Sequence, residues 1–214
     1  MTPPARIDLV RGWAAAPGWL DDHEAAVLRN AVLSTEPGTA IVELGTWCGR
    51  SLLALADFRA TQAETIPGCA RRPLVSIDLY PEKGQAEEAS AQGMQITPHE
   101  AKNICGGLLS AFGVLDVHRY FMDALEAAKM WSRPERISVL YIDDDHSGER
   151  VLAEIEAWMP HLVEKAEICI HDYPHEPYGI RAAVETWLLT HQEWVFVEGD
   201  SSMARFRRRW MPVA

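Results

Sequence analysis

The sequence predicts an α/β fold, a doubly wound, Rossmann-like and mostly parallel sheet that ends in an antiparallel β-hairpin. Five short apolar segments with the character of buried strands alternate with segments of helical periodicity. Two further strand-like segments then flank the turn sequence Gly199-Asp200-Ser201-Ser202, which predicts the hairpin. Because no internal repeat or second domain is visible, we expect residues 1–214 to form one domain.

The chain begins with an expected helical arm, residues 1–37, which precedes a core of residues 38–209. Asp21 is a candidate N-cap, and the acidic residues that follow it suit the first turn of a helix ending near Ser34. The breaker sequence Glu36-Pro37-Gly38 then leads into the first strand.

The remaining elements follow from apolar periodicity and from start and stop signals. Thr97, Pro98 and Glu100 are typical of a helix start. Residues 80–95 are rich in polar and small residues, and we expect either a lid or a surface helix there. The predicted strands are 40–42, 74–77, 117–121, 137–142, 167–170, 193–198 and 203–209, and the predicted helices are 51–59, 97–112, 124–130, 148–163 and 179–190.

Composition excludes several classes of protein. The net charge of −11 argues against a nucleic-acid surface, and no apolar run is long enough to span a bilayer. The N-terminus lacks the apolar core of a signal peptide, and the four cysteines have no CxxC spacing. We therefore expect a cytoplasmic protein that binds neither nucleic acid nor membrane. The basic cluster Arg205, Arg207, Arg208 and Arg209 is expected on the solvated face of an edge strand.

Acidic residues follow every one of the five predicted parallel strands. Ligands of such sheets bind beyond the carboxyl ends of the strands, where these residues would meet. The residues at those ends are Glu43 with its glycine turn, Asp78, Asp123, Asp143 to His146, and His171 with Asp172. This convergence predicts a ligand site at that edge of the sheet.

The turn Gly45-Thr46-Trp47-Cys48-Gly49 is not the GxGxxG fingerprint of dinucleotide-binding proteins. Glu43, just before the turn, would repel a phosphate but suits a ligand that carries an ammonium group. Asp78, at the end of the second strand, is placed to accept the two hydroxyls of a ribose. The turn therefore favours an amino-acid-like, ribose-containing ligand over a nicotinamide dinucleotide.

Three segments resemble a known family. ELGTWCGRS and SIDLY resemble motifs I and II of the class I S-adenosylmethionine-dependent methyltransferases. The segment YIDDDHSGERVLAEIEAWMPHLVEKAEICIHDY resembles bacterial small-molecule O-methyltransferases (methyltransferase domain 24), which are related to the macrocin and aminocoumarin-sugar enzymes and to cephalosporin hydroxylase-like proteins. The resemblance covers roughly residues 38–209. It implies an S-adenosylmethionine-dependent O-methyltransferase that acts on a small hydroxylated acceptor.

The resemblance also implies roles for individual residues. Asp145, the second Asp of the motif, would be the general base, and the neighbouring His146 is a second candidate because histidine suits proton transfer near neutral pH. Asp143, His171 and Asp172 would hold a divalent cation, expected to be magnesium, which would lower the pKa of the acceptor hydroxyl. The implied cofactor-binding residues are Glu43, Gly45, Thr46, Trp47, Gly49, Ser51, Asp78, Asp123 and Asp143.

Two departures from the family pattern leave alternatives open. Asp144 replaces a glycine, and His171 replaces an acid that many metal-dependent members carry, which softens the donor set. The first alternative is a metal-independent methyltransferase in which Asp145 or His146 acts directly, and the second is a non-catalytic cofactor-binding protein. The resemblance is compatible with a homodimer formed through the N-terminal arm or a sheet edge.

Overall fold

The computed structural model describes residues 12–66, 71–80, 89–91, 94–199 and 202–209. Its main sheet has seven strands in the order β5-β2-β1-β6-β7-β9-β8, of which β9 pairs antiparallel with both β7 and β8. The predicted mostly parallel sheet with a terminal hairpin is confirmed. The strands are β1 (Ala40–Leu44), β2 (Leu74–Ile77), β5 (Val117–Tyr120), β6 (Ile137–Ile142), β7 (Leu162–His171), β8 (Trp194–Gly199) and β9 (Met203–Arg208).

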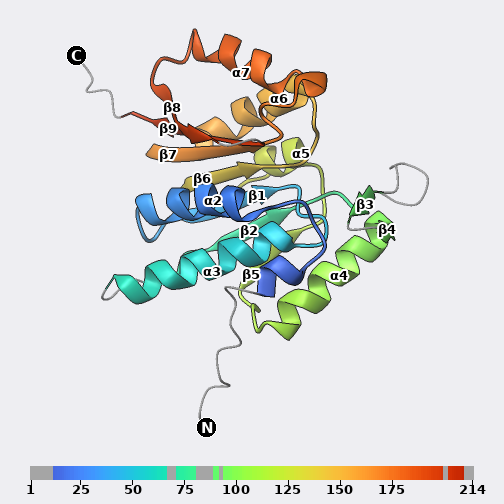
Figure 1. The fold of residues 1–214 in the computed structure, drawn as a ribbon. Coiled ribbons are helices and arrows are strands. Elements are labelled where there is room, and N and C mark those ends of the chain that lie inside the picture. Colours follow the sequence, from blue (N-terminus) through green and yellow to red (C-terminus); the bar gives the residue numbers. More distant parts are fainter. Residues whose placement is uncertain (1–11, 67–70, 81–88, 92–93, 200–201, 210–214) are drawn as a thin grey trace.

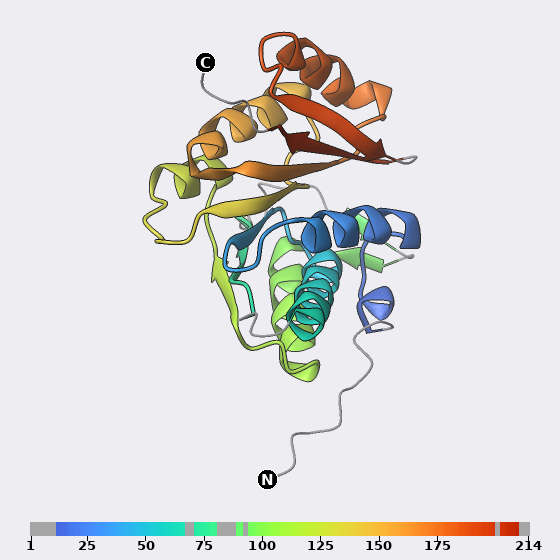
Figure 2. The ribbon, with the colours of Figure 1, turned by 90° about the vertical axis from the view of Figure 1, so that its left-hand side faces the viewer.

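Helices cover both faces of this sheet, so the molecule has three layers (Figures 1 and 2). One face packs against η1 (Trp13–Ala15), α2 (Asp22–Ser34), α3 (Arg50–Thr65) and α4 (Pro98–Ala111). The other face packs against α5 (Ala124–Lys129), α6 (Gly148–Trp158) and α7 (Ile180–Leu188). Every residue of β1 and β6 is buried, as expected for central parallel strands covered on both faces.

Helix starts follow the predicted capping chemistry. Asp21 caps α2, and its side chain accepts the backbone N–H groups of His23 and Glu24. Thr97 and Glu100 form the capping box of α4, in which Pro98 occupies the first turn. These side chains satisfy backbone donors that have no partner inside the helix.

Two predicted helix ends were wrong. Helix α3 continues to Thr65 because the polar side chain of Gln62 is buried and donates to the carbonyl oxygens of Val32 and Thr35, at 2.8 and 2.9 Å. Helix α6 ends at Trp158 and is followed by the short helix η2 (Met159–His161), which contains Pro160. Strand β7 therefore begins at Leu162, five residues earlier than predicted.

The predicted position of the basic cluster was also wrong. Strand β9 is not at the edge of the sheet, because β8 lies outside it. Arg205 is buried, and its Nε lies 2.9 Å from Oε2 of the buried Glu167 on β7. Arg207 binds the other oxygen of Glu167 at 2.6 Å. The cluster is thus partly an internal ion-pair network that joins β9 to β7.

The segment 80–95 is described only in part. Strands β3 (Ala89–Ala91) and β4 (Met94–Ile96) pair antiparallel in a small separate sheet, so the predicted alternative of a surface helix is wrong for these residues. Residues 81–88 and 92–93, like residues 1–11 of the predicted arm, lie outside the described residues. Within the described ranges, every helix is too short or too polar to cross a bilayer.

Candidate functional site

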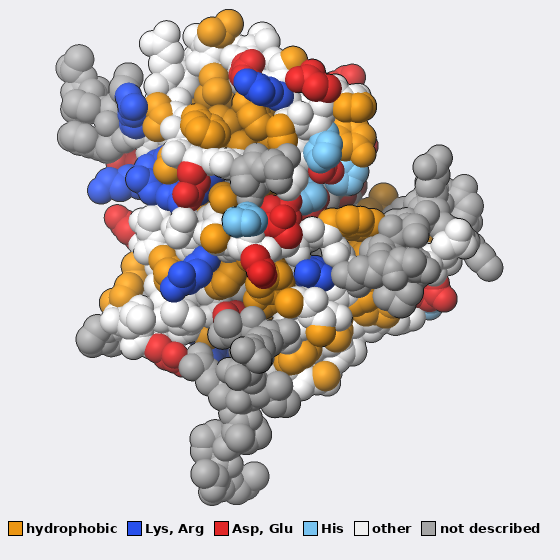
Figure 3. Space-filling view, viewed as in Figure 1, with side chains coloured by type: hydrophobic (Ala, Val, Ile, Leu, Met, Phe, Trp, Pro, Cys, Tyr) orange, Lys and Arg blue, Asp and Glu red, His pale blue; other side chains and the backbone are white. Residues whose placement is uncertain are grey.

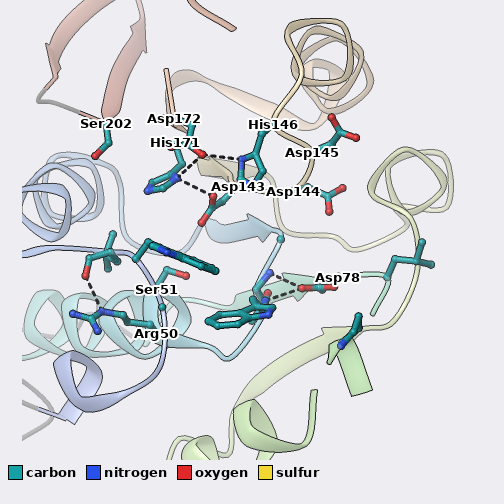
Figure 4. A pocket seen from close by; sticks show the side chains of 18 of the residues that line it. Arg50, Ser51, Asp78, Asp143, Asp144, Asp145, His146, His171, Asp172 and Ser202 are labelled. Carbon is teal, nitrogen blue, oxygen red and sulfur yellow. Dashed lines mark hydrogen bonds and ion pairs between the residues drawn. The ribbon is translucent and has the colours of Figure 1, made fainter. Parts of the chain in front are cut away.

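A cleft of about 880 Å³ opens at the carboxyl edge of β1, β2, β6 and β7. Its size is in the ordinary range for small-molecule sites. Histidine and acidic side chains gather beside α7 on the face shown in Figure 3, and in Figure 4 Asp143, His146, His171 and Asp172 point toward one another. The lining also includes Trp19 and Leu20 of the segment that precedes α2.

The glycine turn forms one wall of the cleft. Gly45 has a φ of +78°, and a Cβ atom there would lie 2.0 Å from the backbone oxygen of Asp143. Only glycine fits this close approach between the turn and the end of β6. Gly49 has a φ of +87° at the N-cap of α3, where a Cβ atom would lie 2.7 Å from the sulfur of Cys105. The glycines therefore let the turn and the helix start approach their neighbours closely.

Asp78 links this turn to the end of β2 by hydrogen bonds. Its Oδ2 accepts the backbone N–H groups of Thr46 and Trp47, each at 2.8 Å, and its Oδ1 accepts that of Tyr80 at 2.9 Å. Trp47 and Tyr80 both have positive φ values, 43° and 45°, which side chains rarely adopt. Asp78 thus lines the cleft as predicted and also holds two strained residues in place.

Glu43 lies beneath the turn rather than in the cleft lining. Its Oε2 accepts the hydroxyl of Thr46 at 2.8 Å, and Thr46 in turn lies 2.6 Å from the hydroxyl of Ser76. Burial raises the pKa of Glu43 to about 8, although the hydroxyls of Ser51 and Thr46 oppose this effect. The structure therefore gives Glu43 a supporting position, where direct contact with a ligand was expected.

The opposite wall holds four titratable side chains from the ends of β6 and β7, which are Asp143, His146, His171 and Asp172 (Figure 4). His146 Nδ1 lies 2.9 Å from Asp172 Oδ2. His171 Nδ1 lies 3.1 Å from Asp143 Oδ1 and 3.5 Å from Asp172 Oδ2. Asp172 has a φ of 52°, so its backbone too is strained at this rim. Four of the predicted reactive residues therefore form a chain of contacts, which does not include Asp145.

These contacts shift the pKa of each partner. The hydrogen bond to Asp172 raises the pKa of His146 above its ordinary value. Burial would lower the pKa of His171, but Asp143, Asp172 and Glu24 outweigh it and hold that pKa well above the ordinary value. Burial would raise the pKa of Asp172, but the contacts with His146 and His171 outweigh it and hold that pKa below its ordinary value. These shifts stabilise the protonated form of each histidine and the ionised form of Asp172.

The three predicted metal ligands do not fit a divalent cation as they stand. Nδ1 of His171 lies within ion-pair distance of Asp143 and Asp172 but has no hydrogen-bond partner among the described residues, and Nε2 lies 3.0 Å from Glu24. Both ring nitrogens thus lie beside carboxylates. Across the described parts of the chain, no group of three or more His, Cys, Asp or Glu side chains has an arrangement that could hold a metal ion.

The two candidate bases differ in placement. Asp145 is exposed, its Oδ1 accepts the N–H of Ser147 at 3.0 Å, and in Figure 4 it points away from the cluster. His146 points toward Asp172, with 45% of its side chain exposed. Of the two, His146 therefore belongs to the hydrogen-bonded cluster.

Asp123 lines the cleft and also has structural partners. Its Oδ1 caps α5 through the N–H groups of Leu125 and Glu126, and its Oδ2 accepts Arg150 at 2.7 Å. Arg150 also lies 2.8 Å from Glu154 and 3.4 Å from Asp144. The carboxylates that the sequence places near this edge are therefore partly neutralised by one arginine.

Several residues of the site were missed in the sequence. The sequence predicted Glu24 only as an acidic residue in the first turn of α2, but its carboxylate contacts His171. Trp19 carried no signal, and its ring lies 4.7 Å from that of Trp47 at the cleft. Tyr178, which follows Asp172 closely in the sequence, lies against His146 with ring centroids 5.5 Å apart. Glu24 and Trp19 come from a segment far from the strand ends, so sequence spacing could not link these two residues to the site.

Comparisons with known proteins agree with the resemblance to methyltransferases. A family model described as a methyltransferase domain matches residues 42–173. A search of curated protein sequences finds no match.

Several solved structures are similar in fold. CalS11, a TDP-rhamnose 3'-O-methyltransferase of calicheamicin biosynthesis, is 19% identical with a TM-score of 0.60, over 93% of this chain and 91% of that one. An O-methyltransferase from Bacillus cereus in complex with SAH is 13% identical with a TM-score of 0.61, over 94% and 89%. A putative caffeoyl-CoA O-methyltransferase from Staphylococcus aureus is 13% identical with a TM-score of 0.60, over 90% and 86%.

Proposed function

The chain belongs to the methyltransferase-domain family and uses S-adenosylmethionine, and from this premise we propose that it is an O-methyltransferase acting on a small hydroxylated acceptor. One observation carries the proposal: the His146–Asp172 pair faces the same cleft as the glycine turn and Asp78. Methyl transfer from a sulfonium needs alignment of donor and acceptor and a base for the hydroxyl proton. The two walls of the cleft supply these two requirements.

In the proposed reaction, the acceptor oxygen forms a bond to the methyl carbon while the bond from that carbon to sulfur breaks. Nδ1 of His146 keeps its proton beside the carboxylate of Asp172, so Nε2 is the nitrogen that takes the hydroxyl proton. The products are the methyl ether, neutral S-adenosylhomocysteine and protonated His146. Asp172, held by both histidines, stabilises the imidazolium that forms.

The divalent cation expected from the family resemblance is left out of this proposal. The reason is the donor set, because both nitrogens of His171 contact carboxylates. We expect the initial rate to be unchanged after treatment with EDTA and dialysis. A rate that falls with EDTA and returns with magnesium would instead support the cation-assisted alternative.

The charged side chains that line the cleft limit the charge of the acceptor that can bind. Among the described lining residues, the only Lys or Arg side chains are Arg50 and Arg150. Arg50 donates to the backbone oxygens of Leu20 and Ala16, and Arg150 is surrounded by carboxylates. The acidic lining residues are Glu24, Asp78, Asp123, Asp143, Asp144, Asp145 and Asp172.

An acceptor with several negative charges would be repelled by this lining. We therefore propose an uncharged or cationic acceptor. Phosphate-bearing compounds, such as the TDP-sugar and CoA thioester in the names of two structural neighbours, suit the cleft less well.

Two experiments test the proposal. Calorimetry should show binding of S-adenosylmethionine and no binding of NADH, and the reverse would point to an oxidoreductase. A panel of hydroxylated acceptors, in matched anionic, neutral and cationic sets, is then assayed for S-adenosylhomocysteine formation.

With an acceptor in hand, the base can be tested by substitution. His146→Gln should lower kcat by about 10²- to 10⁴-fold, the usual contribution of a general base, while leaving cofactor binding intact. His99→Gln, on the exposed part of α4 outside the cleft, is the matched control. Equal activity of the two variants would remove His146 from the mechanism.

A further inference from the structure

Glu24 is a buried carboxylate on the N-terminal helix α2, with only 2% of its surface exposed. Buried carboxylates are rare unless they have charged or hydrogen-bonding partners. We infer that Glu24 is a positioning residue of the site, which fixes the orientation of the His171 ring and thereby links α2 to the proposed base. The link to catalysis rests on the proposed function, whereas the orientation of His171 does not.

Two groups other than His171 hold the Glu24 carboxylate in place. Its Oε2 accepts the backbone N–H of Asp21 at 2.7 Å, and Asp21 caps the N–H of Glu24 in return at 2.9 Å. Its Oε1 accepts the hydroxyl of Ser202, which precedes β9. The backbone N–H of Asp21 and the hydroxyl of Ser202 therefore fix this carboxylate from two directions.

Oε1 of Glu24 also lies 3.0 Å from Nε2 of His171. A ring nitrogen that contacts a carboxylate at this distance carries a proton, so Glu24 sets the protonated position of the ring. The other nitrogen, Nδ1, then lies on the side of Asp143 and Asp172, within ion-pair distance of both and without a hydrogen-bond partner among the described residues. A flipped ring would place carbon atoms beside these carboxylates, so one orientation places both ring nitrogens next to acids.

His171 passes this constraint on to the proposed base. Asp172 Oδ2 lies 2.9 Å from His146 Nδ1 and 3.5 Å from His171 Nδ1, so one carboxylate oxygen lies beside both rings, at ion-pair distance from His171 without a hydrogen bond to it. Glu24 touches neither His146 nor Asp172, and its effect on them passes through His171. It is therefore a positioning residue that acts through a chain of contacts from α2 to the mouth of the cleft.

The test separates this role from helix capping. Glu24→Met keeps the length of the side chain but removes both acceptors, and Glu24→Gln keeps an acceptor oxygen without the charge. Asp21→Ala is the matched control, because it removes the N-cap of α2 without removing the Glu24 carboxylate. The readout is the set of ¹⁵N and ¹H ring signals of the histidines by NMR, assigned with His171→Gln and His146→Gln.

We expect Glu24→Met to change the ring signals of both His171 and His146, Glu24→Gln to change them less, and Asp21→Ala to leave them as in the wild type. With an acceptor from the panel, kcat of Glu24→Met should fall about 10- to 100-fold, in line with the cost of misplaced reacting groups, while its Kd for S-adenosylmethionine stays within about twofold.

Unchanged ring signals in Glu24→Met, or equal changes in Asp21→Ala, would overturn the inference. If Glu24→Met does not fold, Glu24→Gln decides by the same signals. If no acceptor is methylated by the wild type, the proposed function fails, while the NMR result still decides whether Glu24 positions His171.

Discussion

Glu43→Gln should make the protein markedly less sensitive to alkaline pH. Glu43 is fully buried beneath the glycine turn, and its pKa is raised from 4.5 to about 8. The folded state therefore holds a proton on this carboxyl between these two pH values, whereas the unfolded chain has lost it. The stability contributed by the protonated form is complete below about pH 4.5 and is lost as the pH rises toward 8.

The size of the effect follows from the two pKa values. A difference of one in pKa corresponds to about 1.4 kcal/mol, so full ionisation of Glu43 would destabilise the fold by about 5 kcal/mol. Between pH 5 and pH 9 the linkage relation gives about 4 kcal/mol of this loss. Glutamine resembles the protonated acid in shape and charge and does not titrate, so the variant should escape this loss.

Urea unfolding followed by tryptophan fluorescence at a series of pH values measures the free energy of unfolding of both proteins. We expect similar stability at pH 5 and a variant more stable than the wild type by about 4 kcal/mol at pH 9. Glu149→Gln, at an exposed position of α6, should follow the wild type throughout. Parallel profiles for Glu43→Gln and the wild type would refute the reasoning, because they would mean that Glu43 does not titrate in this range.

Two further substitutions test the packing around the site. Gly45→Ala should destabilise the protein by more than about 3 kcal/mol and abolish cofactor binding, because its Cβ would meet the backbone of Asp143. Gly38→Ala, also at positive φ but with no atom within 4 Å, should lower stability by only about 1 kcal/mol, and equal losses would contradict this explanation. Arg205→Met should lower the free energy of unfolding by about 3 kcal/mol because the buried Glu167 loses a partner, and urea unfolding that shows a loss below about 1 kcal/mol would contradict it.

Local patterns predicted the elements that local interactions determine. The strand at residues 74–77 and the capping box of Thr97 and Glu100 occur as expected, since both depend on neighbouring residues alone. The proximity of the acidic residues at the strand ends could be predicted because parallel strands present their carboxyl ends to one edge of the sheet. That rule placed Asp78, Asp143 and Asp172 at the cleft.

The remaining features depend on contacts between distant segments. The length of α3 rests on hydrogen bonds from Gln62 to the end of α2, which periodicity does not reveal. The burial of Arg205 depends on the place of β9 between two other strands. Glu24 looked like an ordinary first-turn acid, because nothing in its own helix indicates that His171 lies beside it. Sequence spacing therefore located the site but not the residues from distant segments that hold the fold and the site in place.

The order of the strands divides the cleft between two stretches of the chain. The glycine turn and Asp78 follow β1 and β2, and Asp123 lies between β5 and α5, whereas the ends of β6 and β7 supply the proposed reactive side chains. The two stretches meet where β1 pairs with β6, so the second stretch could be exchanged as a unit to make a chimera with a new acceptor preference. Glu24 is the exception, because it lies in the first stretch and serves the second. A working chimera would therefore have to carry α2 along with the transplanted half.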